Sequence, residues 1–389
     1  MLLRRRPLLA IAALAVLPRP GASQGDLPRP VPLTIKRSQW AAAPEWRGRL
    51  DARAGFVIGA VEVLRRLDDG LVLLVREEPP HIGGEPATQH VRLERRDATG
   101  RVVWQQSVPG LPGRFGTFNI RYVAGSAQQS SLLVMTFLPV DHRKQAPYGR
   151  IVEVDEATGR MRALGGIARP RTREWIDGDV FEFHGALRLE GGRLALYGGF
   201  GSGPYSWWVA LMRLDGTLLW QAMGQTSAGE VTALRAVPGG YEASVHVIMA
   251  WPDASNVGVF RMRFDEAGRL VGSLKMTANG ALLFAPDGSA ITLGEGSPPV
   301  LIVEDRQGRR RFLAALPAKV SLRYRLDDGA LVLFDDDYDL VVSGDGRTAF
   351  RIERDSRYDT ILSDGRIFVA TCPGDECATR ELALHKRPW

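Results

Sequence analysis

The sequence has little of what marks several large classes of protein. It contains only two cysteines among 389 residues, too few for a disulfide-dense scaffold or a four-cysteine metal site. It has no paired zinc-ligand motif and no glycine-rich phosphate loop. Its longest apolar run, Leu8 to Leu17, has ten residues, about half of the ~20 that a membrane-spanning helix needs. We therefore expect no transmembrane segment, and no catalytic motif can be read directly.

The sequence also has little net charge. The formal net charge is +6, but Arg4, Arg5, Arg6 and Arg19 lie in a segment that we expect to be removed, which leaves a mature chain of +2. A near-neutral chain gives no electrostatic argument for nucleic-acid binding. The charged fraction of 24% is ordinary for a folded protein, so we expect neither a disordered chain nor a coiled coil.

The first 23 residues have the layout of an export signal. Three arginines at positions 4–6 precede the apolar run, and the small residues Gly21, Ala22 and Ser23 follow it. We predict a signal peptide over 1–23 and a single mature domain over 24–389, in the periplasm or secreted. Consecutive arginines suit twin-arginine export, but Pro7 stands where that motif usually has an aromatic residue, so general secretion stays equally open.

Two kinds of turn alternate along the rest of the chain. Seven inner turns each combine glycine with a following apolar run, and six outer turns lie between them, with spacings between their aspartates of 58, 60, 50, 40 and 40 residues. Asp and Gly at these positions are hairpin signals, because glycine accepts a positive φ and Asp bonds its own backbone two residues on. The inner turns lie at Asp69-Gly70, Gly125, Gly191-Gly192, Gly239-Gly240, Asp287-Gly288, Asp328-Gly329 and Asp364-Gly365; the outer turns begin at Asp97, Asp155, Asp215, Asp265, Asp305 and Asp345.

Two hairpins per period make a four-stranded unit, and radial repetition of such units is a β-propeller. We predict an all-β, seven-bladed propeller with four-stranded antiparallel blades. The last blade lacks a strand at its C-terminal end, so we predict that residues 31–36 close the ring as its outer strand. Cys372 and Cys377 flank a short loop near this closure, and in an exported protein we expect them to form a disulfide.

Three segments carry a family resemblance. They are 97–104, which ends in Trp104, 155–159, and 214–220, which ends in Trp220. They resemble the PQQ-like repeat of quinoprotein-type propellers, and the wider stretch 207–241 is similar to repeats of bacterial secreted propellers. The resemblance implies a propeller in which the tryptophans pack between blades and Asp and Thr hold the outer turn. It does not imply a bound cofactor.

Candidate metal ligands fall in the longer loops of the face opposite these turns. His81, His142 and His184, with Asp141 beside one of them, could hold a transition metal or supply a general base. In the acidic run 335–339, Asp335 and Asp337 could hold Ca²⁺. The alternative is that all of these residues are ordinary polar side chains of surface loops, and no cofactor is predicted.

Candidate partner contacts lie on the same face. Trp and Tyr are the residues that most often anchor a partner, and arginines beside an aromatic ring can recognise an acidic or sugar ligand. For Trp207 and Trp208, packing between blades is an equal alternative. The predicted partner-binding residues are Tyr205, Trp208, Trp251, Arg171, Arg173 and Trp175.

These observations favour an exported, non-catalytic and monomeric propeller that binds or scaffolds a protein or glycan of the cell envelope through its long-loop face. The alternative is a periplasmic propeller enzyme, a metal-dependent hydrolase or lyase, with its site in the central funnel.

Overall fold

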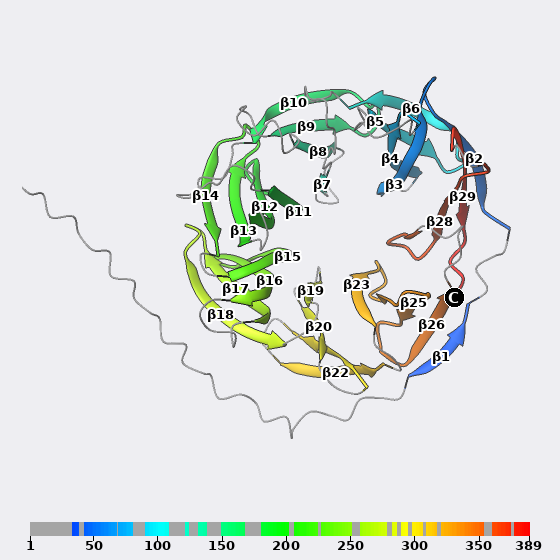
Figure 1. Cartoon of the computed structure of the whole chain (residues 1–389). Coiled ribbons are helices and arrows are strands. Elements are labelled where there is room, and N and C mark those ends of the chain that lie inside the picture. The colour runs from blue at the N-terminus through cyan, green and yellow to red at the C-terminus, as the bar shows by residue number, and fades with distance from the viewer. Residues whose placement is uncertain are drawn as a thin grey trace, which may run out of the picture.

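The computed structural model consists of β-strands arranged in a ring of sheets (Figure 1). Each sheet runs from an inner strand near the axis to an outer strand on the periphery. Among the described residues, no helix is long and apolar enough to span a membrane. The structure describes residues 33–38, 43–67, 69–80, 90–108, 121–123, 131–137, 149–167, 180–201, 206–224, 227–250, 257–277, 282–285, 289–294, 298–305, 309–316, 320–353, 360–374 and 377–389.

Five sheets follow the chain in simple order, from inner to outer strand, and all their strand pairs are antiparallel. They are β3 (Val57–Leu67), β4 (Gly70–Glu78), β5 (His90–Asp97) and β6 (Val102–Ser107); β7 (Arg121–Val123), β8 (Ser131–Phe137), β9 (Gly149–Asp155) and β10 (Met161–Ile167); β11 (Val180–Leu189), β12 (Arg193–Gly201), β13 (Ser206–Arg213) and β14 (Leu218–Met223); β15 (Ser227–Val237), β16 (Gly240–Ala250), β17 (Gly258–Asp265) and β18 (Leu270–Thr277); and β19 (Leu282–Phe284), β20 (Ala290–Gly294), β21 (Val300–Glu304) and β22 (Arg310–Ala315).

The two remaining sheets contain the N-terminal strands. One has the order β1-β26-β25-β24-β23 and the other has the order β2-β29-β28-β27. Their strands are β1 (Thr34–Arg37), β23 (Ser321–Arg325), β24 (Leu331–Phe334), β25 (Tyr338–Val342) and β26 (Thr348–Glu353); and β2 (Trp46–Asp51), β27 (Thr360–Ile361), β28 (Ile367–Thr371) and β29 (Thr379–His385).

The prediction of seven four-stranded blades is wrong. Among the described residues, six sheets have four strands each, and the remaining sheet has a fifth strand because β1 adds to it. The strand predicted to close the ring is also wrong: β1 pairs in parallel with β26, one sheet before the last, and β2 pairs antiparallel with β29 in the last sheet. The burial of the two strands gives the reason. Trp46 and Leu50 of β2 are buried, whereas all four residues of β1 are exposed.

Hydrogen bonds from two buried arginines attach β2 to the neighbouring β3–β6 sheet. Arg92 donates a hydrogen bond from Nη2 to the carbonyl of Asp51 (2.8 Å), and Arg96 donates from Nη2 to the carbonyl of Arg49 (2.7 Å). Arg96 also donates from Nε to Glu94 (2.6 Å). Both guanidinium groups and the carboxylate are buried, and the backbone of the closing strand supplies acceptors that they require.

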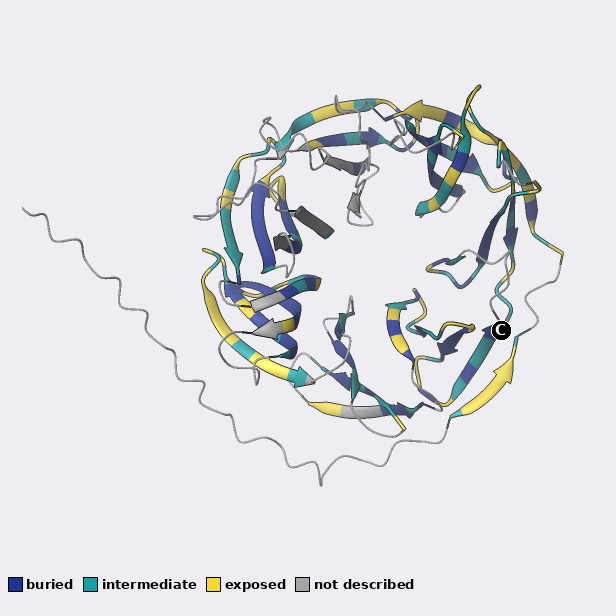
Figure 2. Cartoon of the chain, viewed as in Figure 1, coloured by how far each residue is buried: buried dark blue, intermediate teal, exposed yellow. Residues whose placement is uncertain are grey.

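Apolar contacts between adjacent sheets hold the ring together. The middle strands are the most buried and the outer strands the most exposed (Figure 2). At the periphery, Trp104 of β6 lies against the outer turn of the next sheet and donates from Nε1 to the carbonyl of Glu156 (2.8 Å). Gly159 of that turn has a φ of +72°, and a Cβ there would lie 2.7 Å from the Trp104 ring. Glycine is therefore required both by the turn and by the indole packed on it.

The predicted disulfide is confirmed, since Cys372 and Cys377 are bonded. The carbonyl of Cys377 accepts a hydrogen bond from Ile58 of β3 (3.0 Å), and that of Ala378 accepts one from Ala52 (2.8 Å). The disulfide therefore lies at the seam between the last sheet and the β3–β6 sheet.

Candidate functional site: an arginine-lined groove

Among the described residues, few buried hydrophobic side chains lie between the β15–β18 and β19–β22 sheets. They form a cluster of Val259, Leu282 and Ala290. The interface between the β11–β14 and β15–β18 sheets, on the other side, buries a cluster of thirteen described hydrophobic residues. Charged side chains also lie between these two sheets of the small cluster, β15–β18 and β19–β22.

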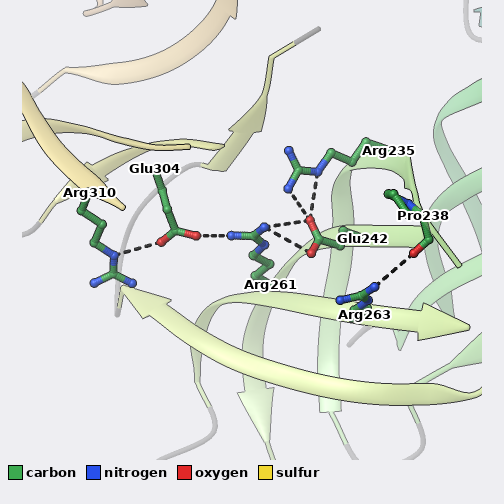
Figure 3. A network of polar contacts seen from close by, with 7 residues as sticks. All are labelled: Arg235, Pro238, Glu242, Arg261, Arg263, Glu304 and Arg310. Carbon is green, nitrogen blue, oxygen red and sulfur yellow. Dashed lines mark hydrogen bonds and ion pairs between the residues drawn. The ribbon is translucent and has the colours of Figure 1, made fainter. Parts of the chain in front are cut away.

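A row of alternating arginines and glutamates crosses this interface (Figure 3). Arg235 donates from Nε to Glu242 (2.9 Å), and Arg261 donates from Nη2 to the same carboxylate (2.9 Å). Arg261 also bonds Glu304 of the next sheet, and Arg310 donates from Nε to Glu304 (2.9 Å). The row therefore joins the two sheets through ion pairs.

Strand register explains how the row forms. Arg235 and Glu242 are directly opposed across the β15–β16 hairpin, and Glu304 and Arg310 are opposed across β21 and β22. Directly opposed residues have neighbouring side chains on one face. Arg261 lies on β17, where it alternates with the buried Phe260 and Met262, so its side chain leaves the apolar face and points toward the row.

Both carboxylates of the row are buried, with Glu242 8% and Glu304 6% exposed. Burial alone would raise the pKa of Glu242, but hydrogen bonds from Arg235 and Arg261 outweigh it and lower the pKa. Glu242 is therefore ionised at neutral pH. Since the row consists of three arginines and two glutamates, its positive charges exceed its negative charges by one.

Two further arginines line the same region without a carboxylate partner among the described residues. Arg263 donates from Nη2 to the carbonyl of Pro238 (3.1 Å), and Arg193 donates from Nε to the carbonyl of Glu190 (3.2 Å). Both side chains are exposed. Nearby Tyr241 is buried, which raises the pKa of its phenol, while the positive charge of Arg193 acts in the opposite direction.

A groove of about 930 Å³ lies beside the row, at the end of the sheets where Pro238 and Gly239 form the β15–β16 turn, and Arg235, Glu242 and Arg261 of the row line it. Five arginines (Arg188, Arg193, Arg235, Arg261 and Arg263), three glutamates (Glu190, Glu242 and Glu266) and apolar side chains including Phe284 line it. The guanidinium of Arg235 lies 4.5 Å from the centre of the Phe284 ring. Guanidinium groups bind carboxylates and phosphates through paired hydrogen bonds, so the groove can bind an anionic group next to an apolar one.

His184 is the one predicted metal-ligand histidine within the described residues. It lies on β11, where Nδ1 is 3.0 Å from the carbonyl oxygen of Val231 and Nε2 is 3.3 Å from Oε2 of Glu230. Both ring nitrogens therefore face oxygen atoms of β15, and the side chain connects two adjacent sheets. His81, His142 and Asp141 lie outside the described residues.

The acidic run 335–339 is partly a turn and partly a strand. Asp335 donates its backbone N–H to the carbonyl of Tyr338 (2.9 Å), and Asp337 is exposed in the same turn. Asp339 belongs to β25 and is fully buried, with Arg323 4.0 Å from its carboxylate. In the part of the chain that the structure describes, no three His, Cys, Asp or Glu residues form a group that could hold a metal ion.

Of the predicted partner-binding residues, Trp208 alone is described. Trp208 is 3% and Trp207 is 7% exposed, and they belong to the apolar clusters on opposite faces of their sheet. Packing between blades, the alternative considered for both, is what the structure shows. Tyr205, Trp251, Arg171, Arg173 and Trp175 lie outside the described residues, so the long-loop face stays a prediction.

The sequence analysis missed the arginine-lined groove. Arg261 and Arg263 alternate with Phe260, Met262 and Phe264, a pattern that does predict a charged face on one strand. It cannot say which carboxylates the arginines meet, because Glu242 and Glu304 come from other strands.

No protein-family model and no curated protein sequence matches the chain. Solved structures match it in shape. The β-propeller domain of the Trilobed protease from Pyrococcus furiosus, which has an open velcro topology, aligns with a TM-score of 0.50 at 9% identity, over 86% of this chain and 94% of that one. The chain is a β-propeller.

Other solved propellers align less well. YCF48 bound to D1 peptide has a TM-score of 0.46 at 13% identity, over 90% of this chain and 99% of that one. Streptogramin B lyase has a TM-score of 0.45 at 12% identity, over 87% and 97%. At such identities the similarity of this propeller to known structures shows the fold alone.

Proposed function

We propose that the protein is an exported, non-catalytic binding propeller that holds an anionic group of a cell-envelope partner in the arginine-lined groove. The observation that carries this proposal is the surplus of arginine there. The lining contains five arginines and three glutamates, and among the described residues the side chains of Arg193 and Arg263 donate only to backbone carbonyls. Charge of one sign gathered in a concave surface attracts the opposite charge.

Two observations support export. The first 23 residues have the layout of a signal peptide. Cys372 and Cys377 form a disulfide, and such bonds persist mainly in oxidising compartments outside the cytosol. Fractionation of cells that express the full chain, with N-terminal sequencing of the product, tests this part: a cytosolic protein that keeps residues 1–23 would contradict it.

A charge reversal in the groove tests the binding function. The mature protein is immobilised and exposed to solubilised envelope of the source cells, with Arg263→Glu beside it and Arg160→Glu, an exposed arginine in the outer turn after β9, as the matched control. We expect wild type and Arg160→Glu to retain the same component and Arg263→Glu to lose it. Equal retention by all three proteins would show that the groove is not the site.

A further inference from the structure

We infer that the ligand of the groove is an acidic peptide segment, one in which Asp or Glu residues are separated by apolar residues. The inference rests on the proposed function, since it names the chemistry of the partner that the groove would hold. Its first support is the charge balance of the groove lining, in which five arginines outnumber three glutamates.

Two arginines of the groove lining are largely shielded from water. The side chains of Arg235 and Arg261 are 13% and 14% exposed. Attraction to an incoming anion is stronger there than on an open surface, because less water screens it. Arg263 is nearer to solvent and contacts only the carbonyl of Pro238 among the described residues, so its remaining donors suit a carboxylate.

The mixed lining of the groove separates an acidic peptide from a uniformly charged polymer. Glu190 and Glu266 line the groove together with the arginines, and they would repel a sulfated or phosphorylated polymer that presents an anion at every unit. Leu234, Val237 and Phe284 also line it. A peptide can place isolated carboxylates on the arginines and apolar side chains on these surfaces, which matches both parts of the lining.

Selection from a random peptide library tests the inference even though the partner is unidentified. A phage-displayed dodecapeptide library is panned on the mature protein, on Arg193→Gln/Arg263→Gln, and on Arg101→Gln/Arg160→Gln. The first variant removes the two groove arginines that no described carboxylate contacts; the second removes two exposed arginines from outer turns of other sheets. Both change the net charge equally, and thermal melting verifies that both are folded.

We expect wild type and the control variant to enrich peptides rich in Asp and Glu with interspersed apolar residues, and the groove variant to lose this enrichment. A synthetic peptide from the selection should bind the groove variant at least about tenfold more weakly than wild type, which corresponds to ~1.4 kcal/mol. Replacement of the Asp and Glu residues of this peptide by Asn and Gln should weaken its binding to the wild-type protein by a similar factor.

Three outcomes would overturn the inference. Enriched peptides could show no acidic excess, or the groove variant could keep the enrichment, or heparin could bind in an Arg263-dependent way while no peptide is enriched. In the third case the groove remains an anion-binding site and the proposed function stands with a glycan as partner. If Arg263→Glu also fails to change envelope binding, the proposed function fails as well.

Discussion

Glu242 is the residue on which the groove depends most. It accepts hydrogen bonds from arginines on both neighbouring strands, β15 and β17, and its carboxylate is buried. Removal of one member of a buried ion pair leaves the other charges without compensation, and this costs more than the pair contributes to stability. The position therefore controls both the fold of this interface and the direction of its arginines.

We predict that Glu242→Gln lowers the free energy of unfolding by about 3–5 kcal/mol, because Arg235 and Arg261 lose their common counter-ion while they remain largely buried. Urea unfolding followed by tryptophan fluorescence measures the change. Glu190→Gln is the matched control, since Glu190 is exposed and surface substitutions usually stay within about 0.5 kcal/mol. Equal effects of the two variants would show that the row does not stabilise the interface.

Single residues were the hardest part of the site to predict. The sequence shows that Arg261 and Arg263 share a strand face, but the partners Glu242 and Glu304 lie on separate strands, and Glu304 is on another sheet. For the two adjacent tryptophans, by contrast, position on the sheet alone explains their burial. Trp207 and Trp208 are adjacent in sequence and point to opposite faces, and both faces of their sheet are buried, so an aromatic side chain at either position packs in the core.

At the scale of elements, the outer turns were predicted most accurately. The sequence places Asp at the start of each outer turn, and the structure shows how this side chain holds the turn. Asp97 accepts hydrogen bonds from the backbone N–H and the hydroxyl of Thr99 (2.8 and 2.7 Å). Asp155 accepts the equivalent pair from Thr158 (2.8 and 2.7 Å). The signal is local, so it can be recognised within one short stretch of the chain.

These turns predict a loss of stability in acid. Hydrogen bonds from Thr99 and Thr158 lower the pKa values of Asp97 and Asp155 below the ordinary 3.8. A carboxyl group with a lowered pKa in the folded state stabilises the protein above its unfolded pKa, and this contribution is lost as the pH falls through the folded pKa. We expect Asp97→Asn/Asp155→Asn to melt lower than wild type at pH 6 and the difference to shrink toward pH 3. Melting curves that stay equally far apart at both pH values would contradict the prediction.

The N-terminal strands were predicted less well, for a physical reason. Val31 to Lys36 alternates as a strand should, but alternation does not say which edge of which sheet accepts it. Several outer strands offer an unpaired edge before the ring is complete. The choice is made by side chains, because Trp46 and Leu50 of β2 fill the core against the β3–β6 sheet, and β1 has no comparable side chains.

At the scale of the whole molecule, β2 should contribute more than β1 to the closure of the ring. We predict that Leu50→Ala costs about 2–5 kcal/mol, the usual range for a leucine truncated in a packed core, because Leu50 is 1% exposed. Ile35→Ala should cost less than about 1 kcal/mol, because Ile35 is 42% exposed and β1 adds only a peripheral strand. Guanidinium unfolding of both variants measures the difference, and a larger loss for Ile35→Ala would mean that β1 is the strand that holds the ring closed.

The all-β class and the propeller architecture could be predicted because they repeat along the chain. Each period contains its own turn signals, and any one of them can be weak without hiding the pattern. The number of strands in each sheet could not be predicted, because it depends on how the two ends of the chain meet. That information is held by two pairings, β2 with β29 and β1 with β26, and each joins residues more than 300 positions apart.

The pairing of β2 with β29 also sets the order of events during biosynthesis. β2 leaves the ribosome more than 300 residues before its partner β29. Until β29 is made, the backbone N–H and C=O groups of β2 that pair with it have no partner strand. The Arg92 and Arg96 guanidinium groups, which donate hydrogen bonds to carbonyls of β2, also lack their final positions. A chain that emerges vectorially must therefore pass through an open form in which β2 lacks its partner strand. That incomplete form, rather than the finished ring, is the state in which this protein is most exposed to proteases and to aggregation.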